Sequence, residues 1–347
     1  MKTCTRQRAL VLSVCLLSFV PVRLRAADEP YHLLKTIPVG GQGGGWDYMS
    51  VDEVNRRLYV AHGSSIAVVD IDKDALVGVI TNTPGVHSLV PVAELQRGFT
   101  CNGRESKAGV VDLKTLETVS KIDTGLSPQT GLFDSGRKEV YIFNGRSASA
   151  TVIDPKASKA IALIPLDGHP ASATIDVKAG RVYVNLEDKS IVAVIDTAKH
   201  EVVERWPVAP GQYPSGLALD VERHRLFVGC HNQTLVMMDS TNGKVIDKVP
   251  IGARVDSVGF DADNNFILAS CGDGTLSVAH EDTPDKISIV QSLPTGAGSR
   301  TLAVDPRTHR VYVATAKFSA PPPGVPGAPR QGPHLLPETF GVMVFGL

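Results

Sequence analysis

The sequence is poor in features that would point to a helical, membrane-spanning or nucleic-acid-binding protein. Aromatic residues make up 5% of the 347 residues, and 35 Lys and Arg face 36 Asp and Glu. This balance argues against a basic surface for nucleic acid. Beyond the N-terminal region no 18 consecutive residues are apolar, so no membrane span is expected there. No window sustains a 3.6-residue apolar period, so almost no helix is expected.

Several motifs that announce a particular chemistry are also missing. The sequence has no Cys-x-x-Cys-His, which excludes covalent c-type haem attachment at such a motif. It has no Gly-x-Ser-x-Gly elbow, no phosphate-binding loop and no His-Glu-x-x-His. The pattern therefore assigns no catalytic residue, and any site has to be argued from the fold.

The N-terminal 26 residues have the order of a secretory signal peptide. Lys2, Arg6 and Arg8 precede a nearly unbroken apolar run over residues 9–20, and Ala26 offers a small residue before a cut. That order predicts export, with cleavage near Ala26 and a periplasmic or secreted domain over residues 27–347. The apolar run is short for a membrane helix, and an uncleaved signal anchor is the alternative.

Loss of the signal peptide would change both charge and cysteine content. It removes five basic residues and no acidic one, which leaves 30 basic and 36 acidic side chains. It leaves Cys101, Cys230 and Cys271, an odd number, so a disulfide framework is not expected to hold the fold. Cys230 and Cys271 are one repeat apart, on sheets too distant for a disulfide, and buried free thiols are expected.

An Asp preceded by an apolar residue recurs at a nearly constant spacing. The first series, with spacings of 42, 42, 42 and 43, is Asp70, Asp112, Asp154, Asp196 and Asp239. The next step of 42 falls on Glu281, in a degenerate copy. The second series is Asp52, Asp134, Asp176, Asp220, Asp261 and Asp305. Each such Asp is expected to end a strand and to accept hydrogen bonds from turn amides.

Between the two series lie β-branched and aromatic runs bounded by turn residues, which predict strands. Each repeat holds four such runs; in the fourth they are 172–177, 181–186, 191–196 and 202–208. Four strands in a repeat of this length are typical of a propeller blade. Seven blades are expected, with first strands starting near Tyr48, Ser88, Thr130, Ser172, Gly216, Ser257 and Thr301.

The predicted fold is an all-β, seven-bladed propeller of four-stranded blades. The lone strand 31–39 is expected to close the ring as the outer strand of the last blade, next to 340–345. A Pro-rich segment, 319–339, interrupts that blade between its second and third strands. It is either a plain insertion or a lid or docking arm in extended form.

The repeat resembles the YVTN-type β-propeller family over residues 31–347. The resemblance rests on the Tyr-Val of the second strand, as in Tyr59-Val60 and Tyr183-Val184, and on the apolar-Asp pair of the third. It rests also on Gly-x-x-Pro between blades, as in 125–128 and 211–214. It implies the propeller fold. The family's motifs are structural, so it implies no activity.

Loops that enter first strands, and loops that join second to third strands, gather on one polar face around the axis of a propeller. This axial mouth is the expected binding site. The candidate ligand-binding residues are Trp46, Asp47, His62, His87, Asn102, Arg104, Gln129, Asn144, Arg146, Asn185, His231, Asp256 and Arg300. We expect Asp47, His62, His87, Asn102 and Arg300 to approach one another, because blades seven, one and two are consecutive.

No cofactor is evident, but a divalent metal is one candidate. His62, His87 and Asp47 offer imidazole and carboxylate ligands for a transition metal. Asn102, Asn144, Asn185 and Glu187 offer oxygen ligands that would suit calcium instead. The alternative is that these are scattered polar loop residues.

The leading functional hypothesis is an exported, non-enzymatic scaffold that binds an unidentified small molecule or protein through the axial mouth. The alternatives are a metal-assisted hydrolase, lactonase or lyase with its site there, and a non-haem subunit of an electron-transfer dehydrogenase. No nucleic-acid partner and no membrane span after cleavage are expected, and a monomer is expected.

Overall fold

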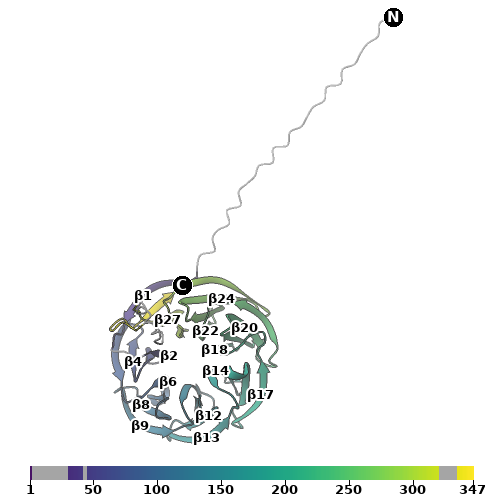
Figure 1. The fold of residues 1–347 in the computed structure, drawn as a ribbon. Helices are drawn as coiled ribbons and strands as arrows, with labels where there is room; N and C mark the ends of the chain where they lie inside the picture. The colour runs from purple at the N-terminus through teal and green to yellow at the C-terminus, as the bar shows by residue number, and fades with distance from the viewer. Residues whose placement is uncertain (2–29, 42–44, 320–333) are drawn as a thin grey trace, which may run out of the picture.

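Seven four-stranded antiparallel sheets form a closed ring in the computed structural model (Figure 1). The structure describes residues 30–41, 45–319 and 334–347, together with Met1. The first strand of each of blades one to six is innermost in its sheet order, and labels such as β2, β6, β14 and β18 lie inside the ring. The predicted all-β, seven-bladed propeller is confirmed.

The strands of blades one to three follow one another along the chain. Blade one holds β2 (Trp46–Asp52), β3 (Arg57–His62), β4 (Ser65–Asp70) and β5 (Ala75–Ile80). Blade two holds β6 (Val86–Val92), β7 (Arg97–Asn102), β8 (Lys107–Asp112) and β9 (Glu117–Asp123). Blade three holds β10 (Pro128–Asp134), β11 (Glu139–Asn144), β12 (Ser149–Asp154) and β13 (Lys159–Pro165).

Blades four to six repeat this order, and blade seven combines the two ends of the ring. Blade four holds β14 (Pro170–Asp176), β15 (Arg181–Leu186), β16 (Ile191–Asp196) and β17 (Glu201–Pro207). Blade five holds β18 (Pro214–Asp220), β19 (Arg225–Cys230), β20 (Thr234–Asp239) and β21 (Val245–Pro250). Blade six holds β22 (Val255–Asp261), β23 (Phe266–Cys271), β24 (Thr275–Thr283) and β25 (Lys286–Pro294). Blade seven holds β26 (Leu302–Asp305), β27 (Arg310–Thr315), β28 (Gly341–Gly346) and β1 (His32–Pro38).

The repeated Asp residues have the turn-capping role that the sequence predicts. In blade one, Asp52 Oδ1 accepts hydrogen bonds from the amides of Val54 and Asn55 at 3.1 and 2.9 Å. Asp70, in the other series, accepts from the amides of Asp72 and Lys73 at 3.1 and 3.0 Å. The same pattern recurs at Asp112, Asp154, Asp196 and Asp220. These carboxylates therefore fix tight turns on the face opposite the mouth.

Burial occurs between neighbouring blades. Seven clusters of buried apolar residues lie one at each junction, including the junction of blades seven and one. The repeated aromatic residues of the second strands belong to them: Tyr59, Tyr141, Tyr183, Phe227 and Tyr312. Because each blade buries its faces only against its neighbours, the closed ring is what completes the core.

The N-terminal strand closes the ring as predicted. β1 pairs antiparallel with β28, from His32 with Gly346 to Pro38 with Gly341. Ile37 is buried at the junction of blades seven and one. Chain segments about 300 residues apart therefore share one blade.

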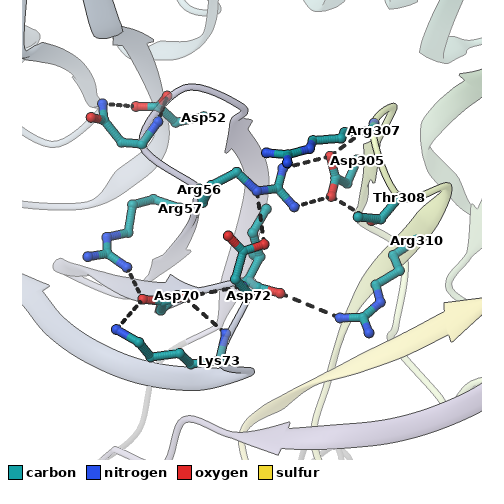
Figure 2. A network of polar contacts seen from close by, with 12 residues as sticks. Asp52, Arg56, Arg57, Asp70, Asp72, Lys73, Asp305, Arg307, Thr308 and Arg310 are labelled. Atoms are coloured by element: carbon teal, nitrogen blue, oxygen red, sulfur yellow. Dashed lines mark hydrogen bonds and ion pairs between the residues drawn. The ribbon is translucent and has the colours of Figure 1, made fainter.

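A polar network ties blade one to blade seven on the face opposite the mouth (Figure 2). Two nitrogens of the Arg56 guanidinium bond the two carboxylate oxygens of Asp305, at 3.0 and 2.7 Å. Asp74 accepts from Lys35 of β1 at 2.8 Å and from Arg310 of β27 at 3.1 Å. Burial alone would raise the pKa of Asp305. The hydrogen bonds from Arg56 and Thr308 outweigh it and hold that pKa below its usual value.

Free cysteines and very little helix are further features of the described part of the chain. Cys230 and Cys271 are free and buried, as expected, and so is Cys101. Within the described residues the helices are two three-residue 3-10 segments, η1 (Ala93–Leu95) and η2 (Glu187–Lys189). No helix in that part of the chain is long and apolar enough to cross a membrane. The predicted signal peptide lies, apart from Met1, outside the described residues.

The Pro-rich segment falls between β27 and β28, as predicted. Its described ends come together through a bridge between Phe318 and Leu335 and a hydrogen bond from the amide of Ser319 to the carbonyl of His334, 2.8 Å long. Residues 320–333 lie outside the described residues. The segment leaves and rejoins the blade at the mouth face.

Candidate functional site

A β-bulge near the start of the first strand recurs in blades one to six. The pairing of first with second strand shifts there, between Trp46 and Met49 in blade one and between Val86 and Leu89 in blade two. Such a bulge turns one side chain out of the regular alternation. The residues at this position, followed by the matching residue of blade seven, are Asp47, His87, Gln129, Ala171, Ser215, Asp256 and Arg300. They form one ring around the axis.

Within this ring Asp47 and His87 form a pair across blades one and two. Asp47 Oδ2 lies 2.6 Å from His87 Nδ1. Both side chains are half-buried and line the same cavity. Gly103 allows this approach, because a Cβ there would lie 2.6 Å from His87 Nε2. The pair presents an imidazole, held by a carboxylate, to the mouth.

A second cluster forms around Asp256. Its carboxylate pairs with Arg300 Nε, lies 3.7 Å from His231 Nε2, and accepts from the Ser215 hydroxyl at 3.4 Å. The hydrogen-bonding interaction with Asp256 raises the pKa of His231, while partial burial opposes the rise. Blades five, six and seven are thus joined by charge at the mouth.

Tyr48 belongs to the site and was not predicted from the sequence. Burial raises its pKa, and the nearby carboxylates of Asp256 and Asp47 raise it further, while a hydrogen bond with Ser172 lowers it. Ser172 belongs to blade four, across the ring from blade one, so the phenol points toward the far side of the axis. The equivalent residues of the other first strands are small: Ser88, Thr130, Ser172, Gly216, Ser257 and Thr301. The sequence signal for Tyr48 was therefore one large residue at a position where the other six blades carry small ones.

The axial cavity, as we call it, has a volume of about 640 Å³ and lies over blades seven, one, two and three. Its lining is Gly45, Trp46, Asp47, Gly63, Gly85, Val86, His87, Gly103, Arg104, Ser106, Leu126, Ser127, Arg146 and Arg300. The lining holds three guanidinium groups, those of Arg104, Arg146 and Arg300. It holds one carboxylate, that of Asp47, which already contacts His87. The side chains of Arg104 and Arg146 form no ion pair or hydrogen bond with another described residue. The cavity is therefore cationic.

Four of the predicted residues are buried and brace the blades. His62 stacks on Phe340 with ring centroids 4.2 Å apart. Asn102 donates to Glu105 Oε1 at 2.8 Å, and Asn144 donates to the hydroxyl of Thr151 at 3.0 Å. Asn185 donates to backbone carbonyls of blade five at 3.1 and 3.0 Å. None of the four lines the axial cavity.

The remaining predicted residues lie at the cavity or beside it. Trp46 lines the cavity and stacks on Phe340 with centroids 5.5 Å apart. Gln129 lies in the ring of bulge residues, where a Cβ on Gly145 would come within 2.5 Å of its amide nitrogen. Of the five residues expected to converge, Asp47, His87 and Arg300 line one cavity. His62 packs on Phe340, and Asn102 is buried with its hydrogen-bond partners, Thr100 and Glu105, in blade two.

The three residues proposed as metal ligands do not come together. Asp47 and His87 are in contact, but His62 packs on Phe340. Among the described residues no three His, Cys, Asp or Glu side chains are grouped as a metal site would need.

Comparison with known proteins supports the fold alone. No family model matches the sequence, and no curated protein matches it. Among solved structures, a chain of Kuenenia stuttgartiensis hydrazine synthase aligns with a TM-score of 0.70 at 14% identity. The alignment covers 79% of this chain and 94% of that one. The YVTN resemblance is not confirmed by these matches, and the chain is shown to share a β-propeller fold with that neighbour.

Proposed function

We propose that this protein is an exported β-propeller that binds a small anionic ligand in the axial cavity. The observation that carries the proposal is the pair of guanidinium groups, Arg104 and Arg146, that face the cavity without a described partner. Guanidinium groups bind carboxylates and phosphates through charge-assisted, often paired hydrogen bonds. A cavity with such groups and no free carboxylate favours anions.

The surrounding residues suit the same task. His87, held by Asp47, can donate from its other ring nitrogen to an anion. Arg300, from blade seven, adds positive charge at the end of the cavity away from blade three, although its ion pair with Asp256 neutralises part of that charge. Tyr48 points toward the far side of the axis and narrows the channel, so a ligand would enter from the mouth rather than through the ring. The glycines of the lining, Gly45, Gly63, Gly85 and Gly103, lower the steric cost of a close approach by a ligand.

Calorimetric titration with phosphate, acetate and succinate in low-salt buffer tests the proposal. The expected result is binding that weakens with added salt and that is absent for neutral succinamide. The double variant Arg104→Gln/Arg146→Gln should lose about ten-fold or more in affinity, since each lost charged hydrogen bond is worth about 1.5–3 kcal/mol.

Arg137→Gln is the matched control, because Arg137 is exposed in a turn on the opposite face. It should leave the affinity unchanged. Absence of binding by all three anions, or an equal loss in the control, would contradict the proposal.

A further inference from the structure

A second cavity on the mouth face adjoins the axial cavity. This rim groove, as we call it, has a volume of about 370 Å³. It is lined by Thr124, Gly125, Leu126, Ser147, Ala148, Ser149, Leu163, Pro165 and Asp167. Leu126 lines both cavities, so the two are neighbours along one path from the axis outward over blade three.

Four of the described side chains that line the rim groove are apolar: Leu126, Ala148, Leu163 and Pro165. The polar ones, Thr124, Ser147, Ser149 and Asp167, all have hydrogen-bond or ion-pair partners. Leu126 and Leu163 are 54% and 63% exposed, although both are large and aliphatic. Asp167 is the charged member of the described lining, and it pairs with Arg205 at 2.8 Å. The Ser147 and Ser149 hydroxyls lie 2.9 Å from each other, and each has a further partner in blade three. The groove therefore offers carbon surface and few free polar atoms.

Leu126 is held in place by its backbone. Its amide donates to Ser147 Oγ at 2.9 Å, and its carbonyl accepts from the amides of Arg146 and Ser147 at 3.1 and 3.3 Å. The next residue, Ser127, has a φ of 57°, which turns the chain sharply. These contacts project a leucine beside Arg146 at the junction of the two cavities.

The repeat itself shows that apolar residues are not required at these two places. In the Gly-x-x-Pro turn that precedes blade five, the residue matching Leu126 is Gln212. At the register position of Leu163, the outer strands of blades two, four and five carry Lys121, Arg205 and Lys248. Polar residues occur at both positions in this fold, so folding does not require the two leucines of blade three. Blade one carries an apolar residue, Val79, at the position of Leu163.

We propose that the ligand is an amphiphilic carboxylate with a straight acyl chain. The carboxylate would bind Arg104 and Arg146 in the axial cavity, and the chain would cross Leu126 to cover Leu163 in the rim groove. This inference rests on the proposed anion binding and adds the class of ligand. Charge complementarity selects the occupant, because the adjoining cavity holds the unpartnered guanidinium groups and the groove holds no free charge.

Titration with straight-chain carboxylates from acetate to decanoate, below their micellar concentrations, tests the inference. Affinity should rise about four-fold for each methylene that the groove covers and then level off. In Leu126→Gln/Leu163→Gln the rise should flatten. Leu163→Gln, which changes the rim groove alone, should weaken binding of the longer acids while acetate binding stays the same. In Arg104→Gln/Arg146→Gln every carboxylate should bind less tightly. Val119→Gln changes an exposed apolar residue of β9 outside the groove and should leave the series unchanged.

The possible failures are distinguishable. Short anions that bind with no dependence on chain length would overturn the rim groove and leave the proposed anion site standing. A chain-length dependence that survives Leu126→Gln/Leu163→Gln would also overturn the groove. The matching straight-chain alcohols separate the two ideas further, since alcohols that bind as tightly as the acids would overturn the arginine site itself.

Discussion

At the scale of single residues, aspartate has two roles in this ring. The position of each Asp in the repeat decides which role it has. Asp52 and Asp70 end strands and hold turn amides, whereas Asp47 and Asp256 face the axis. Glu281 stands where the series of turn aspartates expects its next member. Its carboxyl group is fully buried and pairs with Arg223 at 2.9 Å. The longer side chain is therefore held between blades five and six.

Glu281 should make the protein less stable as pH rises. A carboxylate in an ordinary ion pair has the opposite effect and makes a protein more stable as pH rises. Burial raises its pKa to about 7, although Arg223 opposes the rise. Between the unfolded value of 4.5 and about 7, the folded state binds a proton that the unfolded state lacks. This group should thus lower the free energy of unfolding by up to about 1.4 kcal/mol per pH unit as pH rises through that window.

Glu281→Gln should remove that contribution, so its urea-unfolding curves should lose less stability between pH 5 and pH 7 than wild type. Glu222→Gln changes an exposed carboxylate of the same region and should track the wild type. Identical pH slopes for wild type and Glu281→Gln would show that the carboxyl titrates normally.

At the scale of elements, much was predictable because the repeat averages over seven copies. In blade four the strands predicted at 172–177 and 181–186 are observed at Pro170–Asp176 and Arg181–Leu186. The bulges were not predictable, because they depend on which residues pair across strands. They explain why Asp47 and His87 meet although both lie inside strands rather than in loops.

The same limit applies to the predicted residues that turned out to be buried. His62, Asn102 and Asn144 end second strands, where a side chain can point to the mouth or between blades. The sequence pattern does not distinguish these two directions, because pairing with the bulged first strand decides it. The cationic lining was not predictable as a set, because Arg104 and Arg146 come from separate loops. Only the packing of blades two and three brings both to one cavity.

The contact of Arg56 with Asp305 gives a prediction about how two blades are joined. Asp305 is fully buried and Asp72 is 57% exposed, yet both accept hydrogen bonds from Arg56. Asp305→Asn should lower the free energy of unfolding by roughly 3 kcal/mol, because it leaves a mostly buried guanidinium with only the exposed carboxylate of Asp72 as its charged partner. Asp72→Asn should cost less than about 1 kcal/mol. Urea unfolding of both variants measures the difference, and equal losses would contradict it.

At the scale of the whole molecule, stability depends on closure. Each interblade core needs two blades, and the core between blades seven and one includes Ile37 of the N-terminal strand. β28 has β27 on one side and β1 on the other. Without β1, the edge of β28 would lie open to solvent and to other chains.

Removal of the chain through Pro38 should therefore lower the thermal midpoint sharply and promote association. Differential scanning calorimetry and light scattering after size exclusion measure the two effects. Leu33→Ser, at an exposed position of β1, keeps the backbone ladder and should behave like wild type. A truncated chain that melts at the wild-type temperature as a monomer would show that β1 does not close the ring.

The pairing of β1 with β28 also sets an order of events during synthesis. β1 is the first strand of the ring to be made, and its partner is the last. Until β28 is made, the nascent chain carries β1 without its strand partner, and its most recent blade has an open edge. Contacts so distant in sequence form slowly, and open edges invite aggregation meanwhile. Blades can pack one by one as they emerge, but the ring can close only after β28 has left the ribosome.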